Sequence, residues 1–169
     1  MLNLILRSEQ DQDVNAIFKL TESAFKNAEH TDHTEQFIVN ALRKAQQLTL
    51  SIVAEREQQI IGHVAISPVE ISSGASDWYG LGPISVAPEY QQQGVGSALM
   101  QYSLQQLKQL GAVGCVVLGD PTYYSKFGFK VIPELTLAGV PAEYFQALSF
   151  TGTFPQGEVT YSQAFSATQ

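Results

Sequence analysis

The chain of 169 residues has the length of one domain, and at 44% hydrophobic residues it can bury a core without disulfide or metal support. Nine Lys and Arg residues against sixteen Asp and Glu residues give a formal net charge of −7, with no basic stripe of the kind that nucleic-acid binding requires. The charge balance therefore predicts no nucleic-acid partner. The sequence also has no apolar run of about eighteen residues, so we expect no membrane partner. The single cysteine fits a reducing, cytoplasmic environment.

The first part of the chain predicts a strand followed by two amphipathic helices. Apolar residues alternate over 2–6 with the period of a half-buried strand. They recur at helical spacing over 14–25 and again over 37–45. The polar segment 27–33 between these two helices is expected to be a surface loop.

The middle of the chain predicts a hairpin and one unusual strand. Residues 48–54 and 60–71 alternate with a period of two on either side of a charged turn, which is typical of an antiparallel pair. Residues 78–86 predict the next strand, and Pro83 lies inside it. Because proline has no N–H to donate, we expect this strand to be bulged or unpaired on one side.

The second half predicts a long helix, a strand buried on both faces, a short helical turn and another strand, over 94–110, 113–118, 121–126 and 129–132. The tail after Pro133 has no steady periodicity, and we expect a closing strand near 161–165. The order of elements predicts an α+β, or mixed α/β, sheet with helices on both faces.

The most informative pattern lies where a strand ends, a polar loop follows, and Gly94 and Gly96 open a helix. Free N–H groups at a helix start bind anions, and glycines let a phosphate approach the backbone. The pattern lacks the lysine of a P-loop, and Leu99 stands where a dinucleotide-binding loop has a small residue. The alternative is that Gly94 only makes the turn and Gly96 packs on a neighbour.

Two motifs resemble those of the GNAT superfamily of acyl-coenzyme-A-dependent N-acetyltransferases. Gln91-x-x-Gly94-x-Gly96 is similar to its pyrophosphate loop, and Tyr124-x-x-x-Gly128-Phe129 to its Tyr-x-x-x-Gly-Phe signature. Segment 119–124 also resembles a bacterial subgroup with Gly-x-Pro-x-Tyr-Tyr before Phe-Gly-Phe. Within this segment Asp120 stands where many members carry Asn.

This resemblance implies a GNAT-like fold, with a central mixed, mostly antiparallel, twisted sheet and helices on both faces. A pair of its strands splays apart at the cofactor cleft. One N-acetyltransferase domain would span 1–169, with a core over about 1–132 and a C-terminal extension over 133–169.

The implied reaction moves an acetyl group from acetyl-CoA, a co-substrate used without a metal, to a primary amine of a small molecule or peptide. The amine attacks the thioester directly, with no acyl-enzyme. The implied cofactor-binding residues form a strand and the loop that follows it, namely Ile84, Ser85, Val86, Gln91, Gln92, Gln93, Gly94, Val95, Gly96 and Ser97.

The resemblance implies Tyr124 as the acid that protonates the leaving thiolate, against the alternative that it is a packing aromatic. For the base, which removes a proton from the amine, we predict Glu70 at a strand end, acting directly or through water. Asp120 is a second candidate, and Glu89 is read as a surface residue beside the loop.

For the histidines and the cysteine we predict structural roles only. His30 and His33 lie in a polar loop with no third ligand nearby, and His63 is expected to be a sheet residue, so we predict no metal site. Cys115 lies in an apolar strand, where a buried inert thiol is expected.

The sequence is compatible with a homodimer.

The alternative function is a non-catalytic acyl-CoA-binding sensor or regulatory module. The presence of Tyr124 favours the enzyme, because a protein that only binds the cofactor needs no acid.

Overall fold

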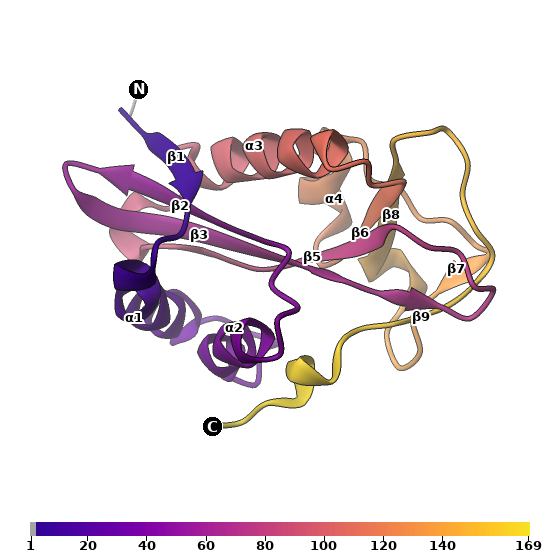
Figure 1. The fold of residues 1–169 in the computed structure, drawn as a ribbon, viewed down its shortest axis with the longest axis horizontal. Coiled ribbons are helices and arrows are strands. Elements are labelled where there is room, and N and C mark those ends of the chain that lie inside the picture. Colours follow the sequence, from indigo (N-terminus) through magenta and orange to yellow (C-terminus); the bar gives the residue numbers. More distant parts are fainter. Residues whose placement is uncertain (1–2) are drawn as a thin grey trace.

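The computed structural model describes residues 3–169, and its largest element is a six-stranded sheet (Figure 1). In spatial order the strands are β1 (Ile5–Ser8), β2 (Leu50–Arg56), β3 (Gln59–Pro68), β5 (Trp78–Val86), β6 (Gly114–Leu118) and β8 (Phe145–Ser149). Neighbouring strands are antiparallel except β5 and β6, which are parallel. The predicted mixed, mostly antiparallel sheet is therefore confirmed.

Helices cover both faces of this sheet, as predicted. α1 (Val14–Phe25) and α2 (Glu35–Lys44) lie on one face, and α3 (Val95–Gln109) with the short α4 (Pro121–Tyr124) lies on the other (Figure 1). The described residues include no helix that is both long and apolar enough to cross a membrane.

The alternation of side chains along the hairpin explains how one sheet serves two cores. Ile52 of β2 and Val64 of β3 belong to the cluster that packs against α3. Their neighbours Val53 and Ala65 belong to the cluster beneath α1 and α2. Because successive side chains of a strand point to opposite faces, the apolar run of each strand is buried from both sides.

The C-terminal residues fold back across the molecule (Figure 1). A second, smaller sheet has the order β4 (Glu70–Ile71), β9 (Gly157–Thr160) and β7 (Leu135–Thr136). The turn at Gln163–Ser166 that follows β9 packs against α2. The C-terminal extension therefore contacts the N-terminal helices that flank the site described below.

The predicted strand at 129–132 is wrong. These residues form a single bridge, from Lys130 to Ala147, while β8 pairs along the whole of β6. Gln146 breaks the apolar pattern of β8, although it is buried and donates to the carbonyl of Gly119 at 3.3 Å. A buried polar residue inside this strand hid it from pattern analysis.

The closing strand is also placed differently, because β9 ends before Tyr161. The Ser162 hydroxyl accepts from the N–H of Ala164 at 3.1 Å, which caps a short 3-10 turn where the strand was expected. At the other end of the chain, the first strand begins at Ile5, and Leu2 of the predicted segment lies outside the described residues.

Candidate active site

The parallel pair at the centre of the sheet separates halfway along β5. Pairing between β5 and β6 ends at Leu81 and Val117. Beyond Pro83, residues Ile84 to Val86 pair with β3 alone. Within residues 3–169 no strand covers the other edge of this segment, so its backbone groups can pair with a ligand. The two strands thus separate at the position predicted from Pro83.

The loop that leads from β5 into α3 has the backbone geometry of an anion site. Gln92 and Gly94 both have positive φ angles, of 61° and 89°. Gly94 precedes the first residue of α3 and provides no side-chain cap, which leaves the first N–H groups of a 15-residue helix available. Gln91 donates to the carbonyl of Val86 at 3.1 Å, and Gln93 donates to that of Glu89 at 3.0 Å. These bonds fix the loop in place.

Gly96 is required by packing as well as by the helix start. A Cβ atom at this position would lie 2.9 Å from the hydroxyl of Tyr123. The structure therefore supports the packing alternative for Gly96, and it also brings a phenol next to the loop. Lys126 lies over the same ring, with its Nζ 4.5 Å from the ring centroid. The sequence carries no signal that joins Tyr123 to this loop.

Tyr124 is the last residue of α4, and it lines a cavity together with Pro83 and Ile84 of β5. Its ring packs against those of Tyr123 and Phe129, with centroids 5.0 and 6.1 Å away. Gly119 leaves room for this ring, because a Cβ there would lie 2.6 Å from Cε2 of Tyr124. Only 9% of Tyr124 is exposed, and burial raises its pKa to about 12. The phenol therefore stays protonated throughout the neutral pH range.

Tyr124 lines a cavity of about 470 Å³ that also receives the free edge of β5. Its walls come from the end of α1, the start of α2, the middle of β5, the end of β6, α4 and the C-terminal tail. The lining residues are Phe25, Glu35, Ile38, Leu81, Gly82, Pro83, Ile84, Leu118, Tyr124, Leu137, Tyr161 and Phe165. A mostly apolar cavity with a few polar groups is typical of a small-molecule site.

Of these twelve residues only Ile84 and Tyr124 were predicted as site residues, and those that were missed include Glu35, Tyr161 and Phe165. Glu35 begins α2, where an acidic residue is ordinary for a helix start. Tyr161 packs so closely on β5 that a side chain in place of Gly80 would collide with its ring. Burial raises the pKa of Tyr161 as well. Sequence spacing carries no signal that joins 35, 161 and 165.

The structure does not bring the predicted base Glu70 into this cavity. Glu70 is exposed on β4, paired with Thr160, and it lines a neighbouring cavity of about 800 Å³ together with Lys44. Tyr161 lines both cavities and separates them. The second candidate, Asp120, is exposed, and it caps α4 by accepting from the N–H of Thr122 at 2.9 Å.

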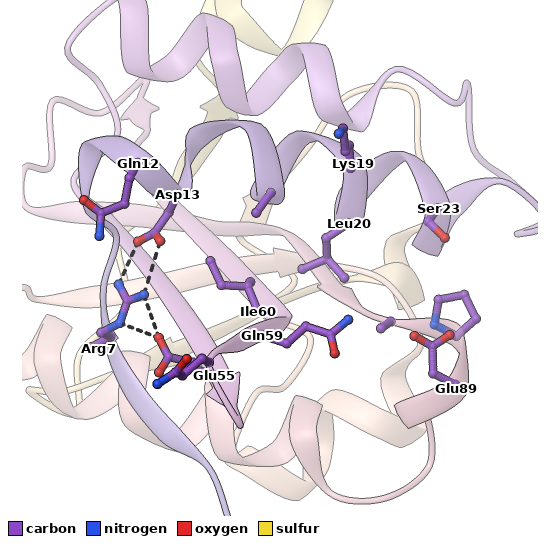
Figure 2. A pocket seen from close by; sticks show the side chains of 14 residues that line it. Arg7, Gln12, Asp13, Lys19, Leu20, Ser23, Glu55, Gln59, Ile60 and Glu89 are labelled. Atoms are coloured by element: carbon purple, nitrogen blue, oxygen red, sulfur yellow. Dashed lines mark hydrogen bonds and ion pairs between the residues drawn. The ribbon is translucent and has the colours of Figure 1, made fainter.

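Glu89 lies within the loop and lines a third cavity, of about 790 Å³ (Figure 2). This cavity shares no lining residue with the one that holds Tyr124. Figure 2 shows its main charged cluster, in which Arg7 donates to Asp13 at 2.7 Å and to Glu55 at 2.9 Å. These charged groups are paired with one another, so the cavity resembles the ordinary polar surface of a folded protein.

The histidines and the cysteine are placed as structural residues. His30 and His33 are exposed in the loop after α1, and His63 is fully buried in β3. Across residues 3–169 no group of three or more His, Cys, Asp or Glu side chains is arranged to hold a metal. Cys115 is fully buried in β6, and burial raises its pKa, so it has no nucleophilic thiolate at neutral pH.

Comparison with known proteins agrees with this geometry. Residues 14–129 match the family model described as the acetyltransferase (GNAT) family. The chain is 35% identical over 129 residues to the uncharacterized N-acetyltransferase YhbS of Escherichia coli, which covers 76% of this chain and 74% of that protein.

Two solved structures are similar over nearly the whole chain. One is a GNAT family acetyltransferase from Brucella melitensis in complex with acetyl-CoA, with a TM-score of 0.87 and 44% identity over 98% of this chain and 99% of the other. The second is YhbS from Escherichia coli in complex with CoA, with a TM-score of 0.88 and 30% identity over 98% of this chain and 93% of the other.

Proposed function

The chain belongs to the acetyltransferase (GNAT) family, and from this premise we propose that it moves the acetyl group of acetyl-CoA to a primary amine of a small molecule or peptide. One observation carries the proposal. The free edge of Ile84 to Val86 begins beside the loop of α3 and ends at the cavity that contains Tyr124. A long thioester cofactor needs this combination of an anion site, an unpaired strand edge and a closed end.

The residues present fit such a cofactor. The N–H groups at the start of α3, from Gln92 to Ser97, would hold the pyrophosphate, since the helix dipole and the positive φ of Gly94 direct N–H groups outward. Backbone groups of Ile84 to Val86 would pair with the amide-containing arm, as one strand pairs with the next. When bound, acetyl-CoA supplies the acetyl thioester.

Tyr124 is assigned as the acid that protonates the departing thiolate. Burial holds its proton in place until a stronger base than water appears beside it. A thiolate released into the mostly apolar cavity would be poorly solvated, which raises its proton affinity and favours transfer from the phenol.

Direct transfer to the amine, with no acyl-enzyme, is what the family resemblance implies, and the placement of Cys115 agrees with it. Cys115 is fully buried and its thiol pKa is raised, so it offers no nucleophile to the thioester. In a direct transfer the amine itself attacks the thioester, and the tasks of the protein are to remove a proton from the amine and to donate one to sulfur.

The base remains a prediction. Glu70 would have to act through water from the cavity on the far side of Tyr161. If it does, Glu70→Gln lowers turnover at neutral pH and raising the pH partly restores it, because more of the amine is then free of its proton. Wild-type turnover of this variant across that range would remove Glu70 from the mechanism. Glu143→Gln, another exposed acidic residue, is the matched control.

The proposed function is tested by thiol release from acetyl-CoA in the presence of a panel of primary amines, with calorimetric titration of acetyl-CoA alongside. Amine-dependent release together with an acetylated product supports the transferase. Tight binding of acetyl-CoA without acetylation of any amine would favour the alternative, a non-catalytic sensor of the cofactor.

A further inference from the structure

The cavity beside Tyr124 has an unequal distribution of charge. Among the described residues that line it, Glu35 alone is charged, and no Lys, Arg or His is present. The remaining walls are aliphatic or aromatic, apart from the hydroxyls of Tyr124 and Tyr161. An acceptor that enters this space meets one negative charge and no positive charge.

The Glu35 carboxylate is held in position before any ligand arrives. The hydroxyl of Thr31 lies 2.6 Å from both carboxylate oxygens. The N–H of His33 donates to the same hydroxyl at 3.0 Å, which ties the loop before α2 to this arrangement. Glu35 also occupies the first position of α2, where the helix dipole stabilises negative charge.

Glu35 has no cationic partner within the described part of the chain. The ion pairs there join Arg7 to Asp13 and Glu55, and Arg43 to Glu9. A carboxylate can accept about four hydrogen bonds, and the Thr31 hydroxyl supplies only one proton. A partly buried carboxylate without a counter-ion beside apolar walls is suited to receive a cation.

The walls around Glu35 indicate what the cation must be attached to. Phe25, Ile38 and Phe165 come from three different elements and add apolar surface to the cavity that Glu35 lines. Aromatic faces also attract ammonium groups directly. A substrate with a second anionic group would bring a carboxylate toward Glu35 with no positive residue to receive it.

We infer that Glu35 binds the ammonium group of the acceptor, and that the acceptor is a small primary amine on an apolar body with no anionic group. This inference rests on the proposed acetyl transfer and narrows its substrate class. It favours simple aryl- or alkylamines over free amino acids. Thr31 is a positioning residue, because it acts through the Glu35 carboxylate.

The test compares phenethylamine with phenylalanine, which differ by a carboxylate, as acceptors of acetyl-CoA. We expect wild-type kcat/KM to be higher for phenethylamine by at least about tenfold, as loss of a charged hydrogen bond or gain of a repulsion predicts. Glu35→Gln should lower kcat/KM for phenethylamine about ten- to hundredfold, mostly through KM. It should also reduce the ratio of kcat/KM for phenethylamine to kcat/KM for phenylalanine. Thr31→Val should shift KM in the same direction by less.

The controls separate recognition from folding. Glu22→Gln removes the same charge from the exposed face of α1 and should leave both amines unaffected. Acetyl-CoA affinity and thermal midpoint of Glu35→Gln should match the wild type. Equal rates for the two amines in the wild type, or an equal loss for both in Glu35→Gln, would overturn the inference.

Failure of the proposed function gives a different result. If no amine of the wider panel is acetylated, the transfer reaction is wrong, and the inference is then decided by calorimetric binding of phenethylamine to the protein with CoA. Binding that disappears in Glu35→Gln supports the cation site, and absence of binding to the wild type overturns it. If other amines are acetylated but phenethylamine is not, the transferase stands and the inferred substrate class is wrong.

Discussion

The two halves of the candidate site are built in opposite ways. The half assigned to the cofactor uses backbone groups from one short stretch, 84–97, whose geometry depends on Pro83 and Gly94. The half that faces the acceptor uses side chains from segments near both ends of the chain, such as Phe25 and Phe165. Backbone recognition leaves a short glycine motif in the sequence, whereas recognition by dispersed side chains leaves none. We therefore expect substitutions in the two halves to act on different quantities.

The largest effect should come from Tyr124, where the two halves meet. Tyr124→Phe keeps the ring and its contacts with Tyr123 and Phe129 but removes the hydroxyl. We expect kcat to fall by about 10²–10⁴-fold, the usual contribution of a general acid, with acetyl-CoA affinity little changed. The loss should shrink with an acyl donor whose leaving thiol is more acidic. Steady-state kinetics with both donors measures this.

Two tyrosine variants serve as references for that result. Tyr102→Phe removes a hydroxyl from a half-buried tyrosine packed on the same core and should have no effect on kcat. Tyr161→Phe removes the second phenol of the cavity. A larger loss from Tyr161→Phe than from Tyr124→Phe would transfer the acid role to Tyr161.

A second prediction concerns the strand that underlies both halves. His63 of β3 pairs in register with Ser85 of the free strand edge. Its Nε2 is hydrogen-bonded to the Ser51 hydroxyl at 2.8 Å. Burial lowers its pKa from 6.5 to about 4, although the charge of Glu9 opposes this shift. The folded state therefore favours the neutral form of His63. The free energy of unfolding that depends on neutral His63 is fully present above pH 6.5 and is lost as the pH falls toward 4.

The pKa shift of His63 corresponds to about 3 kcal/mol over that whole range. Urea unfolding at pH 7 and pH 5 should show about 2 kcal/mol of this loss in the wild type and little of it in His63→Gln. The pKa values of Glu9 and Asp13 are lowered from 4.5 and 3.8, so the stability that these carboxylates contribute is lost mainly below the pH 5 measurement. If the free energy of unfolding falls equally from pH 7 to pH 5 in the wild type and in His63→Gln, His63 does not control acid stability.

The same contrast explains what could be predicted from the sequence. Local periodicity predicts the hairpin and the helices over 14–25 and 94–110. The missing N–H of proline predicts the separation of strands at Pro83. The strand β8 escaped because Gln146 is polar yet buried, with its bond to Gly119 formed only in the folded chain. Local patterns report burial, but they do not report which distant group satisfies a buried polar atom.

The candidate site divides along the same line. The loop proposed to bind the cofactor was identified from Gln91, Gly94 and Gly96, and the structure adds Tyr123 as a packing reason for Gly96. The cavity walls were not predicted, because the tail reaches α2 only through the turn at 163–166. Glu70 was chosen for its place at a strand end, and the fold turns that end toward a neighbouring cavity.

A third prediction isolates the cofactor half without disturbing the fold. Ser97 is the third residue of α3, and the first turn of this helix has no acidic residue. Ser97→Glu should stabilise the helix by about 0.3–1 kcal/mol through the dipole, yet it places a negative charge beside the proposed pyrophosphate site. We expect acetyl-CoA affinity to fall by about tenfold or more, since about 1.4 kcal/mol of repulsion corresponds to tenfold.

The neutral variant Ser97→Gln is the control for size. It should bind acetyl-CoA better than Ser97→Glu and should lack the gain in thermal midpoint. If Ser97→Glu binds acetyl-CoA as tightly as Ser97→Gln in calorimetry, the start of α3 does not hold the phosphates. Gly96→Asp is less informative, because a side chain at 96 would also displace Tyr123.

The smallest effect is expected in the acceptor half, from the tail. Phe165 packs on Tyr161, with ring centroids 5.0 Å apart, and lines the cavity next to α2. Phe165→Ala should raise KM for the acceptor amine by about tenfold, because about 1.4 kcal/mol of apolar contact is lost, and should leave acetyl-CoA affinity unchanged. Phe154→Ala removes another aromatic residue of the tail, one that packs on Trp78 away from this cavity, and should not alter KM. An equal rise in KM from both variants would mean that the tail acts by general loosening of the fold. A fall in acetyl-CoA affinity from Phe165→Ala alone would mean that the two halves of the site are not independent.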